Sequence, residues 1–230
     1  MVLRRFWMTA VAAALLLAGR AAFAADDLER VLRALDAAAA NFHATQADFQ
    51  FDTYQTDPIP EKDTQRGTVY YERKTASFQM AAHINEVDGK PVPKIYTYGA
   101  GVFRLHEPLI NQVTTFKSAG KFESYIMLGF GASGKELADK WEIKYLGSEV
   151  LDGVKTEKLE LTAKDPTVLK NLPKVTIWVD TTRAVSLKQV FDQGQGQTRV
   201  CVYFHIKMNQ PLPVDAFKLA TDAKTNYINR

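Results

Sequence analysis

The sequence predicts a mostly β protein with a helical lid (α+β): a single antiparallel, strongly curved, unclosed β-barrel of about eleven strands covered by helices. Two observations support this fold class. From about residue 45 onwards, apolar and polar residues alternate with a period of two, and only two stretches have a helical period. A long sheet with one apolar face must curl or be covered, and two helical stretches can supply the cover.

The N-terminus is predicted to be a cleaved signal peptide over residues 1–24. Arg4 and Arg5 precede the mostly apolar run Phe6–Leu17, and Ala22-Phe23-Ala24 has the small-x-small pattern of a cleavage site. The twelve-residue run is shorter than the roughly 20 residues that span a bilayer. A lipoprotein signal would need Cys at position 20, which is Arg20. We therefore expect a soluble periplasmic protein with one domain, residues 25–230.

Charge and cysteine content exclude other classes of protein. The formal net charge of +3 comes from the three arginines of the leader, so the domain itself has 26 basic and 26 acidic residues. A neutral domain without a basic stripe is not expected to bind nucleic acid. The one cysteine, Cys201, cannot form an intrachain disulfide and is interpreted as a bystander in a strand. We expect a monomer.

The first helix is predicted over Asp27–Asn41. Its residues Leu28, Val31, Leu32 and Leu35 have the spacing i, i+3, i+4, i+7 of one helix face. A second helical region is expected between Lys121 and Lys140. These two regions are the candidate lid.

The strands follow from alternation, with turn residues such as Asp88-Gly89 and Asp152-Gly153 between them. The apolar positions expected on one face are, in chain order, Phe49 and Phe51; Phe78, Met80, Ala82 and Ile84; Trp141, Ile143 and Tyr145; Leu159 and Leu161; Val175, Ile177 and Val179; Val185, Leu187 and Phe191; and Val200, Val202, Phe204 and Ile206. A sheet of this kind has one apolar and one wetted face.

Several short motifs resemble a known family. They are Ala47-Asp48-Phe49-Gln50, the spacing Gly67-x-x-Tyr70-x-x-Arg73, the segment Pro108–Gln112, and Pro213-Val214-Asp215-Ala216-Phe217. In these motifs the chain resembles the periplasmic outer-membrane lipoprotein carrier proteins of the LolA/LolB-like family. It departs from the family at Lys74, where carriers usually have proline, in the shorter spacing to Phe217, and in Gly129-Phe130-Gly131.

The resemblance implies a carrier that holds the acyl chains of lipoproteins in a hydrophobic cavity. Such a carrier takes its cargo from an inner-membrane exporter complex and delivers it to an outer-membrane acceptor. Because acceptors bear their own lipid anchor, the absence of Cys at position 20 favours a carrier. The alternative is a binder, carrier or sensor of another envelope lipid on the same fold.

Arg73 is the one charged residue expected on the apolar face, since counting by twos from Val69 gives Tyr71 and then Arg73. A guanidinium there can donate to backbone carbonyls of the lid, the role that the resemblance implies for this arginine, or it can reach solvent at the end of the strand. The expected lipid-binding residues are Phe49, Phe51, Val69, Tyr71, Arg73, Phe78, Met80, Ile84, Phe103, Leu105 and Ile110. The expected lid residues are Leu32, Leu35, Phe122, Ile126, Met127 and Phe130.

No catalytic or cofactor site is expected. The segment Gly129–Gly134 spells G-x-G-x-x-G, but a dinucleotide fingerprint requires a βαβ unit, so a hinge beside the lid is the preferred interpretation. The four histidines have no pair at metal-ligand spacing, and Ser133 lacks a G-x-S-x-G elbow. We therefore expect a protein that is not an enzyme.

Overall fold

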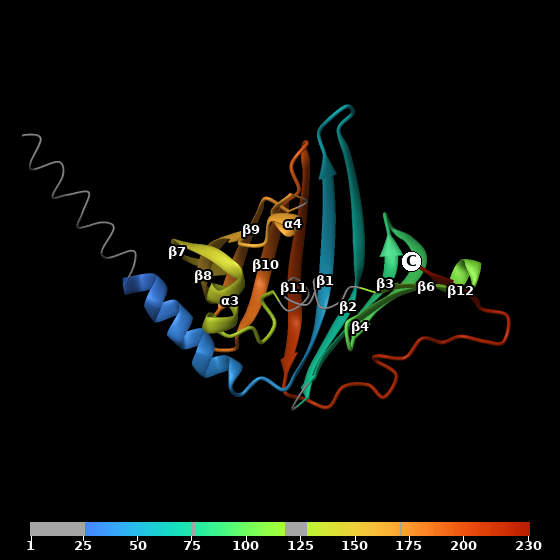
Figure 1. The fold of residues 1–230 in the computed structure, drawn as a ribbon, viewed down its shortest axis with the longest axis horizontal. Coiled ribbons are helices and arrows are strands. Elements are labelled where there is room, and N and C mark those ends of the chain that lie inside the picture. Colours follow the sequence, from blue (N-terminus) through green and yellow to red (C-terminus); the bar gives the residue numbers. More distant parts are fainter. Residues whose placement is uncertain (1–25, 75–76, 118–127, 171) are drawn as a thin grey trace, which may run out of the picture.

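The computed structural model describes residues 26–74, 77–117, 128–170 and 172–230, whose strands form one sheet of twelve that does not close (Figure 1). The strand order is β12-β6-β5-β4-β3-β2-β1-β11-β10-β9-β8-β7, so that β7 and β12 are the two edges. The strands are β1 (Ala44–Gln55), β2 (Glu61–Lys74), β3 (Ser77–Val87), β4 (Lys90–Gly99), β5 (Val102–Glu107), β6 (Gln112–Lys117), β7 (Trp141–Leu151), β8 (Val154–Ala163), β9 (Lys174–Asp180), β10 (Val185–Asp192), β11 (Gln197–Met208) and β12 (Asn226–Asn229).

This arrangement confirms the predicted mostly β, unclosed fold, with two differences. The first is a twelfth strand, β12, which is only four residues long and therefore too short to show an alternating pattern. The second is that β12 pairs with β6 in parallel, whereas all other neighbouring strands are antiparallel. The predicted signal peptide and the lid candidates Phe122, Ile126 and Met127 lie outside the described residues.

The described residues include four helical segments. A helix over residues 26–39 lies beside the β7 end of the sheet (blue in Figure 1). The others are α3 (Gly134–Lys140), α4 (Pro166–Leu169) and the 3-10 turn η1 (Pro108–Ile110). Ser133 and Glu136 form a capping box at the start of α3, which fixes where the loop before it ends.

The apolar side chains gather in two clusters on one face of the sheet, which we call the inner face. The aliphatic cluster lies between the helix over 26–39 and strands β7 to β9. Its buried members are Val31, Leu35, Leu128, Ala132, Leu137, Trp141, Leu159, Leu161, Ala163, Val175, Ile177, Val179 and Ala184. The aromatic cluster lies on β1 to β4, β10 and β11. Its buried members are Phe42, Ala47, Phe49, Val69, Tyr71, Phe78, Met80, Ile84, Tyr98, Phe130, Val185, Leu187, Cys201 and Tyr203.

One strand departs from the predicted alternation. On β11, the sequence pattern assigned Val200, Val202 and Phe204 to the apolar face, and this is wrong. The inner residues are Cys201 and Tyr203, which are 3% and 8% exposed. Because one extra residue of β11 lies opposite Ala47, a β-bulge is formed at His205, whose φ is +51°. Beyond the bulge the faces exchange, so that Ile206 packs against the aromatic cluster as predicted.

The chain after β11 covers part of the opposite, outer face. It runs from the end of β11 past the lower ends of β2 and β4 to β12 (red in Figure 1). His83 of β3 hydrogen-bonds the carbonyl of Ala216 at 2.9 Å through its Nε2, and Ala216 is only 1% exposed. Within the motif that contains Ala216, Val214 is 87% exposed, so its side chain faces solvent and not the sheet.

Candidate functional site

The candidate site is the part of the inner face that β1, β2 and β3 present. Phe49, Val69, Tyr71, Phe78 and Ile84 are each 5% exposed, and Met80 is 9% exposed. The strand register places Tyr71 opposite Met80, and Val69 opposite Ala82. Because the side chains of alternate residues share a face, these strands build a continuous apolar surface, which is almost completely covered in this structure.

The remaining predicted lipid-binding residues lie at the margin of this surface. Phe51 and Phe103 pack against the aromatic cluster while partly buried, and Leu105 is half-buried opposite Tyr96. Ile110 does not lie on a strand face: it belongs to η1 and is 63% exposed. Counting by twos fails there because the 3-10 turn interrupts the strand period.

Phe130, a predicted lid residue, is completely buried and belongs to the aromatic cluster. Its ring stacks on that of Tyr71, with the centroids 4.1 Å apart and an interplanar angle of 9°. Tyr203 meets the same ring edge-on at 4.7 Å and 80°. Phe130 is 0% exposed, and two of the residues that cover its ring are aromatic.

The backbone around Phe130 is held on both sides. The amide of Ser186 donates to the carbonyl of Gly129 at 2.6 Å, and the amide of Gly131 donates to the carbonyl of Ala184 at 2.8 Å. Phe130 itself forms a β-bridge with Val185. Gly129 and Gly131 have φ of +78° and +70°, and a Cβ on Gly131 would collide with the ring of Phe42. These glycines are therefore required by a tight, fixed turn.

Arg73 ties this turn to β2. Its Nη2 donates to the carbonyl of Gly131 at 2.8 Å and lies 3.5 Å from a carboxylate oxygen of Glu136. The Arg73 side chain is 28% exposed, and its backbone amide donates to the carbonyl of His43 at 2.8 Å. Of the two interpretations of Arg73, the structure has the hydrogen bond to a loop carbonyl. Whether this bond acts on a lid remains a prediction.

A buried polar network lies beside the stack. Tyr203 donates from its hydroxyl to Oε1 of Gln189 at 3.1 Å, and the amide nitrogen of Gln189 donates to the carbonyl of Leu128. Burial raises the pKa of the Tyr71 and Tyr203 hydroxyls, and it raises the pKa of the Cys201 thiol to about 12. Cys201 is therefore protonated at neutral pH, as expected of a bystander.

The predicted lid residues on the first helix have different surroundings. Leu35 is 1% exposed and belongs to the aliphatic cluster, whereas Leu32 is half-buried. Arg30 of the same helix lies 3.2 Å from the carboxylate of Glu157, which also accepts hydrogen bonds from Tyr145 and Ser148, both at 2.7 Å. The helix is thus fixed to the β7 to β9 end of the sheet.

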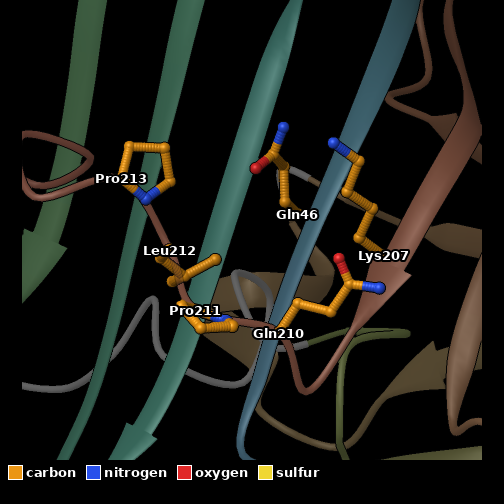
Figure 2. Close-up of a pocket in the computed structure, with 6 residues that line it drawn as sticks. All are labelled: Gln46, Lys207, Gln210, Pro211, Leu212 and Pro213. Carbon is orange, nitrogen blue, oxygen red and sulfur yellow. The ribbon is translucent and has the colours of Figure 1, made fainter.

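Other polar features of the described residues form no comparable site. No group of three or more His, Cys, Asp or Glu residues is arranged there to hold a metal ion. A pocket of about 290 Å³ lies on the outer face, where Gln46, Lys207 and Gln210 approach the segment Pro211–Pro213 (Figure 2). Gln46 alternates along β1 with the inner residue Ala47, so this pocket is separated from the apolar surface by the sheet.

The sequence did not point to Tyr203, Gln189 or Tyr98 as parts of the inner face. Tyr98 is 2% exposed and pairs with Met80 on one side and Phe103 on the other. The alternation in Ile95–Gly99 could have indicated Tyr96 and Tyr98. Tyr203 had no such signal because the bulge at His205 reverses the alternation of β11.

Comparisons with known proteins support the fold. No family model and no curated protein matches the chain. An uncharacterised conserved protein from Thermus thermophilus is similar in structure, with a TM-score of 0.55, 11% identity, and coverage of 88% of this chain and 98% of that one.

MucB is similar at a TM-score of 0.53 and 12% identity, covering 88% of this chain but 66% of the MucB chain. A LolA-superfamily protein from Nitrosomonas europaea matches at 16% identity over 83% of this chain and 97% of that one, with a TM-score of only 0.43. At these identities the likeness to the first two proteins shows a similar fold and no more. Within the described residues, no helix has the length and apolar character needed to cross a bilayer.

Proposed function

We propose that this protein is a carrier that binds the acyl chains of lipoproteins on its inner face. The observation that supports this most directly is the aromatic cluster itself, in which seven of the fourteen buried residues carry aromatic rings and a methionine lies among them. Aromatic and methionine side chains adapt to irregular apolar ligands better than close-packed aliphatic ones do. The hydrogen bond from Arg73 to the carbonyl of Gly131 joins β2 to the turn that carries Phe130, and in this proposal it is the contact that holds the lid closed.

The chemistry of transport requires both a dry surface and a limit on affinity. Each buried CH₂ of an acyl chain contributes about 0.8 kcal/mol, so several long chains cannot cross water unprotected. A carrier that bound them much better than a bilayer does would not release them. Part of the binding free energy must therefore be used to open the apolar surface to the ligand. Breaking the hydrogen bond from Arg73 to Gly131 during this opening would lower the net affinity.

The proposed route is from an inner-membrane exporter complex to an outer-membrane acceptor. The leader at residues 1–24 would direct the protein to the periplasm, and Arg20 in place of Cys would leave it without a lipid anchor of its own. The protein would act there as a soluble monomer.

A second candidate is a binder, carrier or sensor of another envelope lipid. The same apolar surface would accept free phospholipid acyl chains, because these offer the same hydrocarbon to the cluster. The two candidates differ in what is covalently attached to the hydrocarbon.

Mass spectrometry of co-purifying material distinguishes the candidates. The chain is expressed with its leader in a Gram-negative host, purified from the periplasm without detergent, and extracted. Acylated peptides support the carrier of lipoproteins, and phospholipid alone supports the second candidate. Met80→Asp, on the apolar surface, should remove the bound material, whereas Val150→Asp, at a position 65% exposed on β7, should retain it. If wild-type protein carries no acyl compound and binds none added to it, the proposal is wrong.

A further inference from the structure

The segment 128–132 lies along the boundary between the two apolar clusters. Leu128 and Ala132 belong to the aliphatic cluster, while Phe130 between them belongs to the aromatic cluster. Phe130 forms an isolated β-bridge with Val185, and Gly129 and Gly131 on either side of it have positive φ. The turn over residues 128–132 therefore separates the two clusters on the inner face, and we call it the partition. Its Phe130 side chain packs in the aromatic cluster, and its Leu128 and Ala132 side chains pack in the aliphatic cluster.

The partition is anchored to both halves of the sheet. On the β10 side, Ser186 and Ala184 hold the backbone at Gly129 and Gly131. On the β2 side, Arg73 holds the carbonyl of Gly131 at 2.8 Å. Three backbone-directed hydrogen bonds, in addition to that of Gln189 to Leu128, must be lost before the ring can leave. Loss of buried hydrogen bonds is costly because each group is left unsatisfied.

We propose that Phe130 is a specificity-determining residue, the end wall that sets the longest hydrocarbon chain that the inner face accepts. This inference rests on the proposed function, since it concerns where a bound acyl chain stops. A chain lying along the aromatic cluster meets the Tyr71–Phe130–Tyr203 stack, and the aliphatic cluster behind it is closed to the chain.

The stack has the properties of a wall rather than of a contact surface. Tyr71 covers one side of the Phe130 ring at 4.1 Å and Tyr203 meets it at 4.7 Å, so a ligand cannot intercalate without separating rings that already contact each other. The ligand class follows from this geometry: saturated chains that end at the stack bind fully, and the additional carbons of longer chains stay in water.

A chain-length series tests the wall. Saturated fatty acids of about 8 to about 18 carbons compete with a fluorescent fatty acid for the purified protein, and affinity should rise about fourfold for each added methylene that is buried. Wild-type protein should show a length beyond which affinity no longer rises. In Phe130→Ala, the space left by the ring should move this limit by about three to four carbons. Phe130→Leu, which keeps most of the volume, should move it by about one carbon at most.

Leu161→Ala is the matched control, because it opens a comparable space in the aliphatic cluster, behind the wall, where Leu161 is 0% exposed. Its limit should equal that of wild type. If Phe130→Ala does not fold, as judged by its circular dichroism, Phe130→Val takes its place with a smaller expected shift.

The possible failures separate the two proposals. If wild-type protein binds no fatty acid of any length, the proposed function is wrong and the inference is wrong with it. If wild type binds but shows no limit, or if its limit is the same in the folded Phe130 variants, only the end wall is refuted. An equal shift in Leu161→Ala would also refute it, since the wall would then not separate the halves.

Discussion

The two halves of the inner face differ in what they are made of and in how they are held. The aliphatic cluster contains one aromatic residue among thirteen buried members, and Leu159, Leu161, Val175 and Ile177 are all 0% exposed. In the aromatic cluster, half of the buried members carry rings, and Met80 remains 9% exposed. Both clusters lie on the same sheet, so the difference comes from side chains and not from topology.

This is the difference that the proposed function requires, with a permanent core at the aliphatic end and a ligand-binding region at the aromatic end. Branched aliphatic side chains have few rotamers and pack in a single arrangement, whereas Met and aromatic rings tolerate several partners. The charged residues follow the same division. Arg30 pairs with the buried carboxylate of Glu157 at the aliphatic end, while Arg73 at the aromatic end donates to the backbone carbonyl of Gly131. The former contact holds a helix against the sheet, and the latter joins β2 to the turn at Gly131, with Glu136 a further 3.5 Å contact of the guanidinium.

The largest expected effect is on stability at the aliphatic end. Leu161→Ala should lower the free energy of unfolding by about 2–5 kcal/mol, because the cavity is enclosed and cannot collapse. Met80→Leu at the aromatic end should change it by less than about 1.5 kcal/mol, because volume is conserved. Urea unfolding measures both values, and fatty-acid binding should be altered only by Met80→Leu. If fatty-acid affinity fell by a similar factor in Leu161→Ala and Met80→Leu, the aliphatic and aromatic halves would not differ in ligand binding.

The second expected effect is on lipid release. Arg73→Leu should still accept lipid, but it should transfer lipid to liposomes at least about tenfold more slowly, because a charged hydrogen bond contributing roughly 1.5–3 kcal/mol no longer favours the closed state. Transfer is followed by the dequenching of a fluorescent acyl probe.

Arg73→Lys is the control for this effect. Lysine keeps the charge but lacks the planar fork of the guanidinium, so transfer at an intermediate rate is expected. Wild-type transfer by Arg73→Leu would show that the bond to Gly131 is only structural.

A smaller effect is expected on how the free energy of unfolding depends on pH, through Glu157 at the aliphatic end. Burial alone would raise the pKa of the Glu157 carboxyl, but hydrogen bonds from Ser148, Tyr145 and Arg30 outweigh it, and the pKa is lowered from its usual value of 4.5. A carboxyl whose pKa is depressed on folding contributes stability above the unfolded pKa and loses it as pH falls through the folded one. Glu157→Gln should therefore flatten the decline of stability below about pH 4.5. Glu142→Gln, at an exposed position of β7, should leave the decline unchanged.

Alternation could predict most of the sheet, because a strand with one buried face repeats every two residues. It correctly placed Phe49, Val69 and Phe78 on the inner face. It failed at His205, where a bulge inserts one residue, and at Ile110, where a 3-10 turn interrupts the strand. The bulge has no composition of its own, so local pattern could not reveal it, whereas Pro108 at the start of η1 is a strand breaker that could have indicated the turn at Ile110.

The site was less predictable than the fold because its contacts join distant parts of the chain. The spacing Val69-x-Tyr71-x-Arg73 could indicate that Arg73 shares a face with apolar residues. It could not indicate that Gly131, 58 residues later, supplies the carbonyl that Arg73 bonds. The stack of Phe130 between Tyr71 and Tyr203 likewise depends on three segments meeting, which only the assembled sheet determines.

The smallest expected effect lies at the margin of the aromatic half, at Ile110. This residue was expected to bind lipid, yet it is 63% exposed in η1. Ile110→Ser should change the free energy of unfolding by no more than about 0.5 kcal/mol, as is usual for exposed positions. Fatty-acid affinity should also stay within about twofold, since little apolar area is lost from the bound state. A fall of tenfold or more on titration would mean that the ligand extends past β5 to the edge of the sheet, and the aromatic half would then be an open surface instead of a bounded one.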